Sequence, residues 1–281
     1  MMSLKKIRIQ LITFLLIFIT LVVGFGWGMS RDEPFIKILP FDSAGAQLAL
    51  IIILIVITSI IGGFFGGYVF GPLFLLVHMK IIGRKMSYGI QLREEPERFK
   101  GTFKAIFPSL MAINFSFIFA SDPNIVSLIV FSDIQNYAPL MAFMFIMTIT
   151  IGVSMAVFSP IWFLLDAGIV YTNKNKVEDR RDPIEVRSVG GWFHYSLKGY
   201  AGISVIITYI LFLLSIFEYF GKDLHWSTPL GLIPFPIILN FLALPSIFIL
   251  EITVKHRKKY ILVFAKKLGI TGPLEDPLNI K

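Results

Sequence analysis

The 281-residue chain is 56% hydrophobic and only 16% charged, and its mean hydropathy is +0.77. A soluble domain of this length carries many more polar residues, so the composition indicates a membrane protein. The absence of cysteine excludes disulfides, thiolate catalysis and Cys-based metal clusters. A net charge of +8 would suggest a nucleic-acid partner in a soluble protein, so the distribution of that charge matters.

Six apolar segments follow one another along the chain and predict transmembrane helices. About 20 residues at 1.5 Å rise cross a hydrocarbon core of ~30 Å. Backbone groups in lipid must pair within their own segment, which favours helices. We therefore expect an all-α, polytopic integral membrane protein with a single transmembrane domain over residues 1–281. The predicted spans are residues 9–29, 48–72, 105–121, 139–165, 201–219 and 229–250.

Lys and Arg alternate with these spans. Only Arg31, Lys37 and Lys222 fall outside the N-terminus and three basic segments. The positive-inside rule then predicts that both termini are cytoplasmic, and a cell (plasma) membrane is the expected location. No nucleic-acid partner is expected, because no single soluble module gathers the charge. The basic segments are residues 80–104, 174–198 and 255–281.

The last basic segment includes residues 258–268, which mix lysines with large apolar side chains. This pattern predicts a short amphipathic helix on a membrane surface. Its lysines favour anionic headgroups at the cytoplasmic face of the bilayer as a partner.

A proline followed six residues later by an ionisable residue occurs three times, at intervals of 88 and 85 residues. Such a period predicts a repeated unit, here three tandem helical hairpins arranged as a pseudo-three-fold bundle. The alternative is that apolar spans of similar length end alike by chance. The pairs are Pro72 with His78, Pro160 with Asp166, and Pro245 with Glu251.

These three prolines are candidate helix breaks. Each removes a backbone donor and leaves without a partner the carbonyl four residues earlier, at Tyr68, Ala156 and Phe241. Freed carbonyls in a membrane must be paired by neighbours or water, so aligned breaks indicate hinges or a cavity. The alternative is that the prolines only turn the chain onto the membrane interface.

The ionisable residues of the repeat, His78, Asp166 and Glu251, are candidates for binding an ion or solute, or for gating. If the pseudo-three-fold is real, they line the cytoplasmic mouth of a central path, where charge is retained for a use. The alternative is that they lie at the interface, where charge costs little. A metal site formed by all three is disfavoured, because a pore holds them apart, and no cofactor is expected.

A glycine ladder precedes Pro72 and makes this stretch a candidate for close helix packing. The spacing fits packing within the monomer, contact with a second copy or a membrane-protein partner, or a gating hinge. The ladder consists of Gly62, Gly63, Gly66, Gly67 and Gly71.

No catalytic motif is present: the chain lacks a zinc-protease helix, a nucleophile elbow and a phosphate-binding loop. The repeat, the proline breaks and the recurring ionisable position favour a transporter or channel, or a membrane subunit of one, for a small solute or ion. The alternatives are a non-transporting scaffold or assembly subunit and a membrane-embedded lipid-modifying enzyme.

Overall fold

A computed structural model describes residues 44–91, 103–120, 138–173, 187–220 and 240–274, and all structural statements concern these residues. The described part is mostly helical, which confirms the predicted class in its coarse form. Two helical stretches, Ala49–Ile81 and Ala142–Asp166, are long and apolar enough to cross a membrane. The predicted span at residues 9–29 lies outside the described residues, as does much of the span at residues 229–250.

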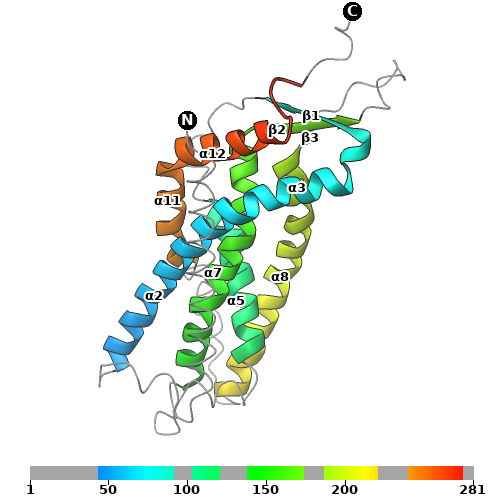
Figure 1. Ribbon diagram of the computed structural model, residues 1–281. Coiled ribbons are helices and arrows are strands. Elements are labelled where there is room, and N and C mark those ends of the chain that lie inside the picture. The colour runs from blue at the N-terminus through cyan, green and yellow to red at the C-terminus, as the bar shows by residue number, and fades with distance from the viewer. Residues whose placement is uncertain (1–43, 92–102, 121–137, 174–186, 221–239, 275–281) are drawn as a thin grey trace, which may run out of the picture.

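The helices form a bundle whose members run alternately toward and away from one end (Figure 1). The first is a continuous bent helix made of α2 (Ala44–Phe65), the π-helical turn η2 (Gly66–Phe70) and α3 (Gly71–Ile81). Three 3-10 turns, η3 (Gly83–Lys85), η4 (Phe103–Ala105) and η7 (Asn240–Ala243), join the elements. The other helices are α5 (Ile106–Ala120), α7 (Ala138–Asp166), α8 (Val189–Phe220), α11 (Leu244–Ile252) and α12 (Val254–Lys267).

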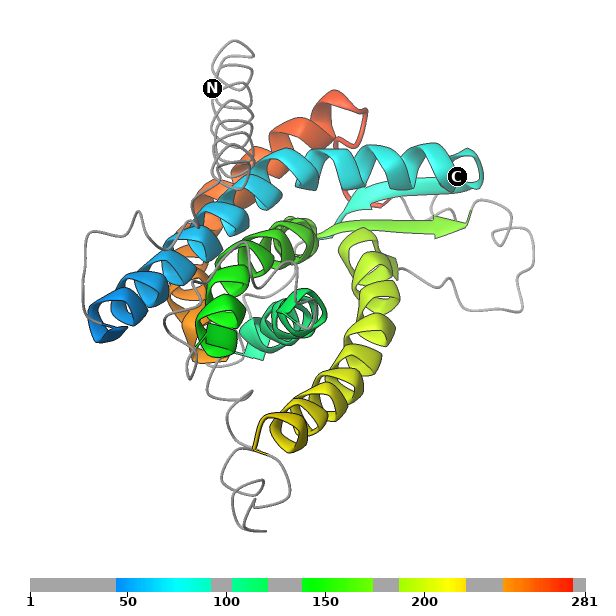
Figure 2. The ribbon, with the colours of Figure 1, turned by 90° about the horizontal axis from the view of Figure 1, so that it is seen from below.

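Helix α7 occupies the centre of the bundle, with α2, α5, α8 and α11 around it (Figure 2). Its side chains Ile151, Met155 and Ile161 are completely buried. A helix that is apolar all round is stable only when neighbours or lipid cover every face. The core of the molecule therefore runs along α7.

Large aliphatic side chains are exposed on the outer helices. Ile53 of α2 is 54% exposed, and Ile206 and Leu214 of α8 are 62% and 58% exposed. Exposed aliphatic surface of this extent is unfavourable in water and favourable in lipid. The exposed faces of these outer helices are therefore apolar at these positions.

The contact of α2 and the first residue of η2 with α7, which we call the α2–α7 contact, is made by small residues on both sides. A Cβ atom added to Gly62 would collide with the Gly152 carbonyl, and one added to Gly66 with Ala156. The pairs Gly62/Gly66 and Gly152/Ala156 each have a spacing of four, so two small-xxx-small faces meet. This spacing lets backbones approach closely enough for Cα–H···O contacts. The contact lies within one chain.

A three-stranded antiparallel sheet accompanies the helices, and the sequence analysis did not predict it. Its strands are β1 (Met86–Ile90), β2 (Ile169–Asn173) and β3 (Arg187–Ser188), in the order β1-β2-β3. Tyr88 pairs with Tyr171, and Val170 with Ser188. The strands are short, so their pairing rather than their hydrophobic pattern defines them.

The sheet, α3, η3 and α12 lie together at one end of the bundle (Figure 1). We call this end of the molecule the cap. There α3 runs across the end of α7, while α2 runs along the bundle (Figure 1). Helix α12 packs against α3, η2 and α7.

Candidate functional site

The bend that turns α3 into the cap begins in a π-helical turn. Residues Gly66–Phe70 form this wider turn, and Pro72 follows in the first turn of α3. The Tyr68 carbonyl, which Pro72 cannot pair, accepts a hydrogen bond of 2.9 Å from the Tyr260 hydroxyl. Burial, and then the nearby Tyr68, raise the pKa of Tyr260 to about 12, so the hydroxyl keeps the proton that it donates. Helix α12 thus supplies the neighbour that the freed carbonyl requires.

The other two candidate helix breaks have different local structures. Pro160 lies inside α7, and the Ala156 carbonyl that it leaves unpaired faces Gly66 across the α2–α7 contact. Pro245 lies in the first turn of α11, after the 3-10 turn η7, where a proline starts a helix without removing a bond. Pro72 therefore lies where a long helix changes direction, whereas α7 continues through Pro160 and the expected break there is not observed.

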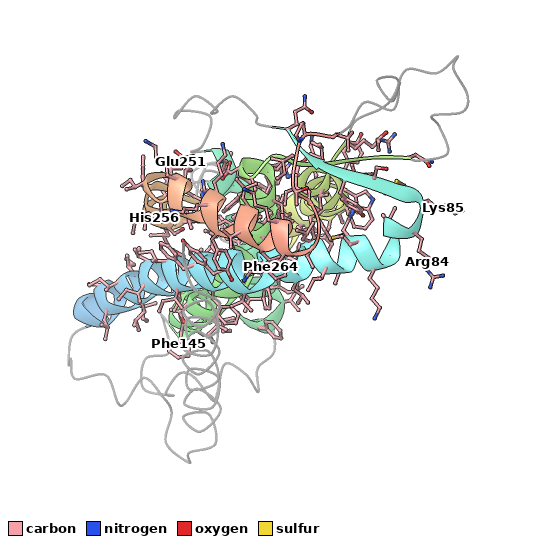
Figure 3. The ribbon with its side chains drawn as sticks, turned by 45° about the horizontal axis from the view of Figure 1, so that its top comes forward. Arg84, Lys85, Phe145, Glu251, His256 and Phe264 are labelled. Atoms are coloured by element: carbon pink, nitrogen blue, oxygen red, sulfur yellow. The ribbon has the colours of Figure 1, made fainter. Side chains whose placement is uncertain are left out.

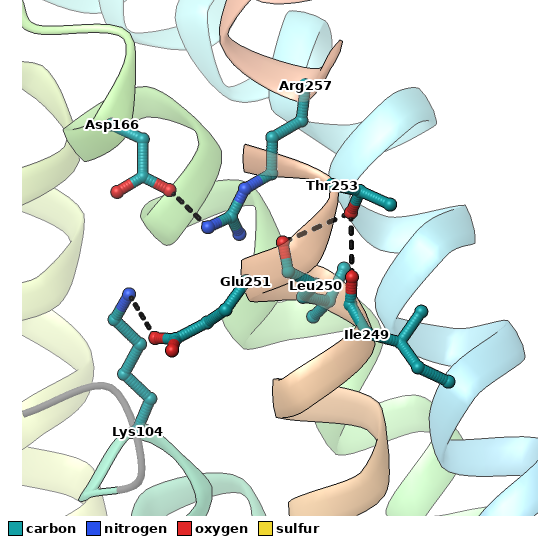
Figure 4. A network of polar contacts seen from close by, with 7 residues as sticks. All are labelled: Lys104, Asp166, Ile249, Leu250, Glu251, Thr253 and Arg257. Atoms are coloured by element: carbon teal, nitrogen blue, oxygen red, sulfur yellow. Dashed lines mark hydrogen bonds and ion pairs between the residues drawn. The ribbon is translucent and has the colours of Figure 1, made fainter. Parts of the chain in front are cut away.

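A buried arginine links the ends of α7, α11 and α12 (Figure 4). Arg257 Nη2 lies 2.7 Å from Asp166 Oδ2, and the two side chains are only 1% and 10% exposed. Nη2 and Oδ2 form a close ion pair. The guanidinium carbon also lies 5.3 Å from the centre of the Phe163 ring, a favourable cation–π contact.

The turn between α11 and α12 places Arg257 in this position. Thr253 donates its hydroxyl to the carbonyls of Ile249 and Leu250 at 3.0 and 3.1 Å, which closes the end of α11. The amide of Arg257 then donates to the Thr253 carbonyl at 3.1 Å and begins the next helix. Because this junction is tight, the side chain of Arg257 faces the bundle.

A second ion pair lies beside the first. Lys104 Nζ in η4 is 3.5 Å from Glu251 Oε1, and both side chains are 21% exposed (Figure 4). Burial lowers the pKa of Arg257, and the negative charges of Asp166 and then Glu251 oppose this shift. The charge cluster, which we define as Lys104, Asp166, Glu251 and Arg257, is therefore neutral in sum. Three of its residues lie at or near ends of α7, α11 and α12, and the ion pairs hold these helix ends together.

His78 lies in a different group of side chains, although it too is completely buried. Its ring is packed by Tyr171 at 4.6 Å, Trp192 at 5.3 Å and Phe193 at 6.1 Å between ring centres. Nδ1 lies 3.0 Å from the Tyr88 hydroxyl. Nε2 finds no hydrogen-bond partner among the described residues.

The Tyr88 hydroxyl keeps its proton near neutral pH, because burial, with Tyr171 as a smaller cause, raises the pKa of Tyr88 to about 12. His78 thus joins α3, the sheet and the start of α8. Of the three ionisable residues that the sequence singles out, the structure brings Asp166 and Glu251 together around Arg257, and not His78. Within the described ranges, no three His, Asp or Glu side chains are grouped as a metal would require.

Buried hydroxyl and amide side chains follow the interior of the bundle toward the charge cluster. All are at most 8% exposed. The Ser116 and Thr150 hydroxyls are 2.7 Å apart, between α5 and α7, and Ser246 Oγ lies 3.9 Å from Met155 Sδ, between α11 and α7. We call this set the polar seam: Asn114, Ser116, Thr150, Ser154, Ser159 and Ser246.

Three atoms of the polar seam, Asn114 Oδ1, Ser154 Oγ and Ser159 Oγ, have no hydrogen-bond partner among the described residues. Leaving a buried polar group unpaired costs about 1–3 kcal/mol. These groups surround α7 and face different neighbours: Thr150 faces α5, whereas Ser159 faces Gly66. Because buried polar groups are nearly always paired, a chain that keeps several unpaired ones has a use for them or holds water there. Asn114, Thr150 and Ser154 are recognisable in the sequence as polar residues inside apolar spans, but their spacing does not show that Asn114 Oδ1 and Ser154 Oγ lack partners.

Three further residues of the site, Arg257, Lys104 and Tyr260, were not predicted from the sequence. Arg257 and Tyr260 lie in the basic C-terminal segment, where a solvated or lipid-facing position is the usual expectation. One signal in the sequence could have identified the buried side of this helix. Its residues have the spacing of one helical face: Arg257, Tyr260, Ile261 and Ala265. The expected amphipathic helix at residues 258–268 starts one residue too late to include Arg257.

No known protein family, curated protein or solved structure matches this chain. The class of protein is therefore defined by the fold alone: the described residues are mostly helical and include two helices long and apolar enough to cross a membrane.

Proposed function

We propose that the chain is a six-span membrane protein that conducts or transports a small solute or ion, with a cation as the favoured cargo. The observation that carries this proposal is the polar seam with its three unpartnered oxygen atoms. Hydroxyl, amide and backbone carbonyl oxygens are the groups that replace the water shell of a hard cation. The seam is rich in these groups and has no Lys or Arg.

The charge cluster supports the same proposal at one end of the seam. Asp166 ends the α7 helix that carries Thr150, Ser154 and Ser159. Opening the Asp166–Arg257 contact exposes a carboxylate to an arriving cation, whereas the closed pair neutralises it. We infer that this pair forms the cytoplasmic gate of the path.

The cytoplasmic assignment of the cap rests on charge. Every Lys and Arg in the described ranges belongs to the cap, to the charge cluster or to the first third of α8. Cytoplasmic segments of membrane proteins carry this excess.

The test is ion flux through proteoliposomes that contain the full chain. Potassium and sodium efflux is measured with ion-sensitive dyes for the native chain and for Asn114→Leu/Ser154→Ala. We expect the double variant to lower flux at least about tenfold, as the loss of ~1.4 kcal/mol of cation stabilisation produces. A merely structural seam predicts unchanged flux and an unchanged or higher unfolding temperature, because an unpaired buried polar group is removed.

Ser196→Ala provides the matched control, because Ser196 is an exposed serine of α8 outside the seam. A second arm replaces both carboxylates of the charge cluster, Asp166→Asn/Glu251→Gln. Unchanged flux in this variant would count against a gating role for the two carboxylates. Efflux no faster than that of empty liposomes for both ions would overturn the favoured cargo.

A scaffold or assembly subunit is the second candidate, and an α8 face that the described residues leave uncovered favours it. Gly199 and Gly202 have open space where a side chain would stand, beside the exposed Ile203 and Ile206. Small residues on an exposed helix face allow a partner helix to approach closely. Loss of a co-purifying membrane protein in Gly199→Leu/Gly202→Leu would support this function. Gly66 is unsuited to the test because it packs inside the chain.

A further inference from the structure

The exposed side of α3 is an apolar stripe that ends in positive charge. Leu73, Leu76, Val77 and Ile81 are 47%, 40%, 37% and 67% exposed. Together with the exposed Lys80, they occupy positions i, i+3, i+4, i+7 and i+8, which is one face of a helix. Helix α3 therefore turns an apolar face outward.

The position of α3 explains what such a face can contact. Helix α3 runs across the end of α7 (Figure 1). The apolar stretch Ala142–Asp166 has 25 residues, which corresponds to about 37 Å at 1.5 Å per residue. With α7 crossing the bilayer, its end at Asp166 reaches the headgroup level, and α3 lies along that level.

Helix α12 adds a row of lysines beside α3. Its buried side is Arg257, Tyr260, Ile261 and Ala265, and Ile261 contacts α3 near Gly71. The lysines Lys255, Lys259 and Lys266 are exposed and lie on another face, since their spacing of four and seven is helical. Figure 3 shows α12 along the bent helix, with Arg84 and Lys85 at the far end of α3.

The described residues of the cap provide almost no negative charge to balance these lysines and arginines. Among the described residues, the acids are Asp166, Glu218 and Glu251. Asp166 and Glu251 are already paired, and Glu218 lies near the end of α8 that is away from the cap (Figure 1). The exposed charge of the described cap is therefore positive throughout.

We propose that α3 and α12 together bind anionic phospholipids. The apolar stripe of α3 contacts the acyl chains. The lysines of α12, together with Lys80, Arg84 and Lys85, surround the phosphates. An amphipathic helix in the interface plane binds through apolar area and through attraction to anionic lipid. Lipid on α12 bears directly on the Arg257–Asp166 pair, because α12 carries both the lysines and Arg257. The proposal stands whether or not the chain transports an ion.

The experiment counts lipids bound to the full chain in neutral detergent by native mass spectrometry. Phosphatidylglycerol is compared with phosphatidylcholine of the same acyl chains and with glycerol phosphate alone. We expect tighter binding of phosphatidylglycerol, and no retained glycerol phosphate because it lacks acyl chains for α3. The variant Lys255→Gln/Lys259→Gln/Lys266→Gln should weaken phosphatidylglycerol binding at least about tenfold and leave phosphatidylcholine unchanged, since each basic residue near an anionic surface adds to the attraction.

The matched control is Arg31→Gln/Lys37→Gln/Lys222→Gln, which removes the same charge from the loops predicted on the opposite side. It should bind phosphatidylglycerol like the native chain. Equal binding of the two phospholipids, or equal loss in the two triple variants, would overturn the proposal. Retention of glycerol phosphate would overturn the role of the apolar stripe.

Discussion

Arg257 is the residue whose environment departs most from the usual one for its type. It is 1% exposed, and a buried guanidinium is stable only with a charge partner and favourable contacts. Asp166 supplies the opposite charge at 2.7 Å, and the Phe163 ring supplies a cation–π contact. Arg257 therefore fixes α12 to the end of α7.

Arg257→Ala should strongly destabilise the protein, because it leaves the Asp166 carboxylate buried without its partner. Breaking a buried ion pair on one side costs about 3–5 kcal/mol. Lys104→Ala is the matched control: its pair with Glu251 is longer and more exposed, and such pairs contribute about 0–1 kcal/mol. Thermal unfolding of the purified chain, followed by tryptophan fluorescence, measures both.

Adding Asp166→Asn to Arg257→Ala should recover part of the loss, because the unpaired charge is removed. Equal effects of Arg257→Ala and Lys104→Ala would contradict a special role for the buried pair.

At single positions, the sequence showed which groups need a partner but not which residues provide it. It identified Pro72 and the carbonyl of Tyr68 that needs a partner, but not the partner. Tyr260 is 192 residues away along the chain, and no local pattern links two residues at that separation. Asp166 was singled out by spacing, whereas Arg257 was hidden in a basic run where one arginine resembles its lysine neighbours.

The packing of α2 against α7 requires their backbones to approach closely. A glycine-to-alanine substitution, which adds one methyl group, tests this requirement. A Cβ at Gly66 would collide with Ala156 and Ser159, whereas no described residue outside its own stretch of helix lies within 4 Å of a Cβ at Gly199. Gly66→Ala should therefore destabilise the protein by about 1–3 kcal/mol through overpacking. Gly199→Ala should stabilise it by about 0.5–1 kcal/mol, since alanine is the better helix former.

The opposite signs of these two changes, measured as shifts in the thermal unfolding temperature, distinguish helix contact from general intolerance of glycine replacement. A neutral Gly66→Ala would show that α2 and α7 separate at little cost.

Element type was easier to predict than element boundaries. The apolar run at residues 139–165 lies within α7. In contrast, α8 begins at Val189, twelve residues before the predicted span, because the aromatic residues there are helical too. The strands were not predicted because such short segments show no reliable alternation of apolar and polar residues. In addition, β1 and β2 pair although the whole α5–α7 hairpin separates them in the sequence.

At the scale of the whole molecule, the two ends of the described bundle differ in kind. One end holds the sheet, the charge cluster, the His78 group and the exposed lysines, whereas the described elements that continue toward the other end are helices (Figure 1). A bilayer with an anionic inner leaflet attracts the basic end. The path, the gate and the lipid surface that we propose all require this end to be cytoplasmic.

The orientation can be tested directly because the native chain contains no cysteine. Single cysteines are introduced at Lys85 and Lys259 in the cap and at Lys37 and Lys222 in loops predicted on the opposite side. We expect a membrane-impermeant maleimide to label the cap positions only in inside-out vesicles, and the loop positions only in intact cells. The positive-inside rule sets this expectation, and the native chain gives the unlabelled background. Labelling of Lys259→Cys in intact cells would reverse the topology and remove the basis for a cytoplasmic gate at Asp166 and Arg257.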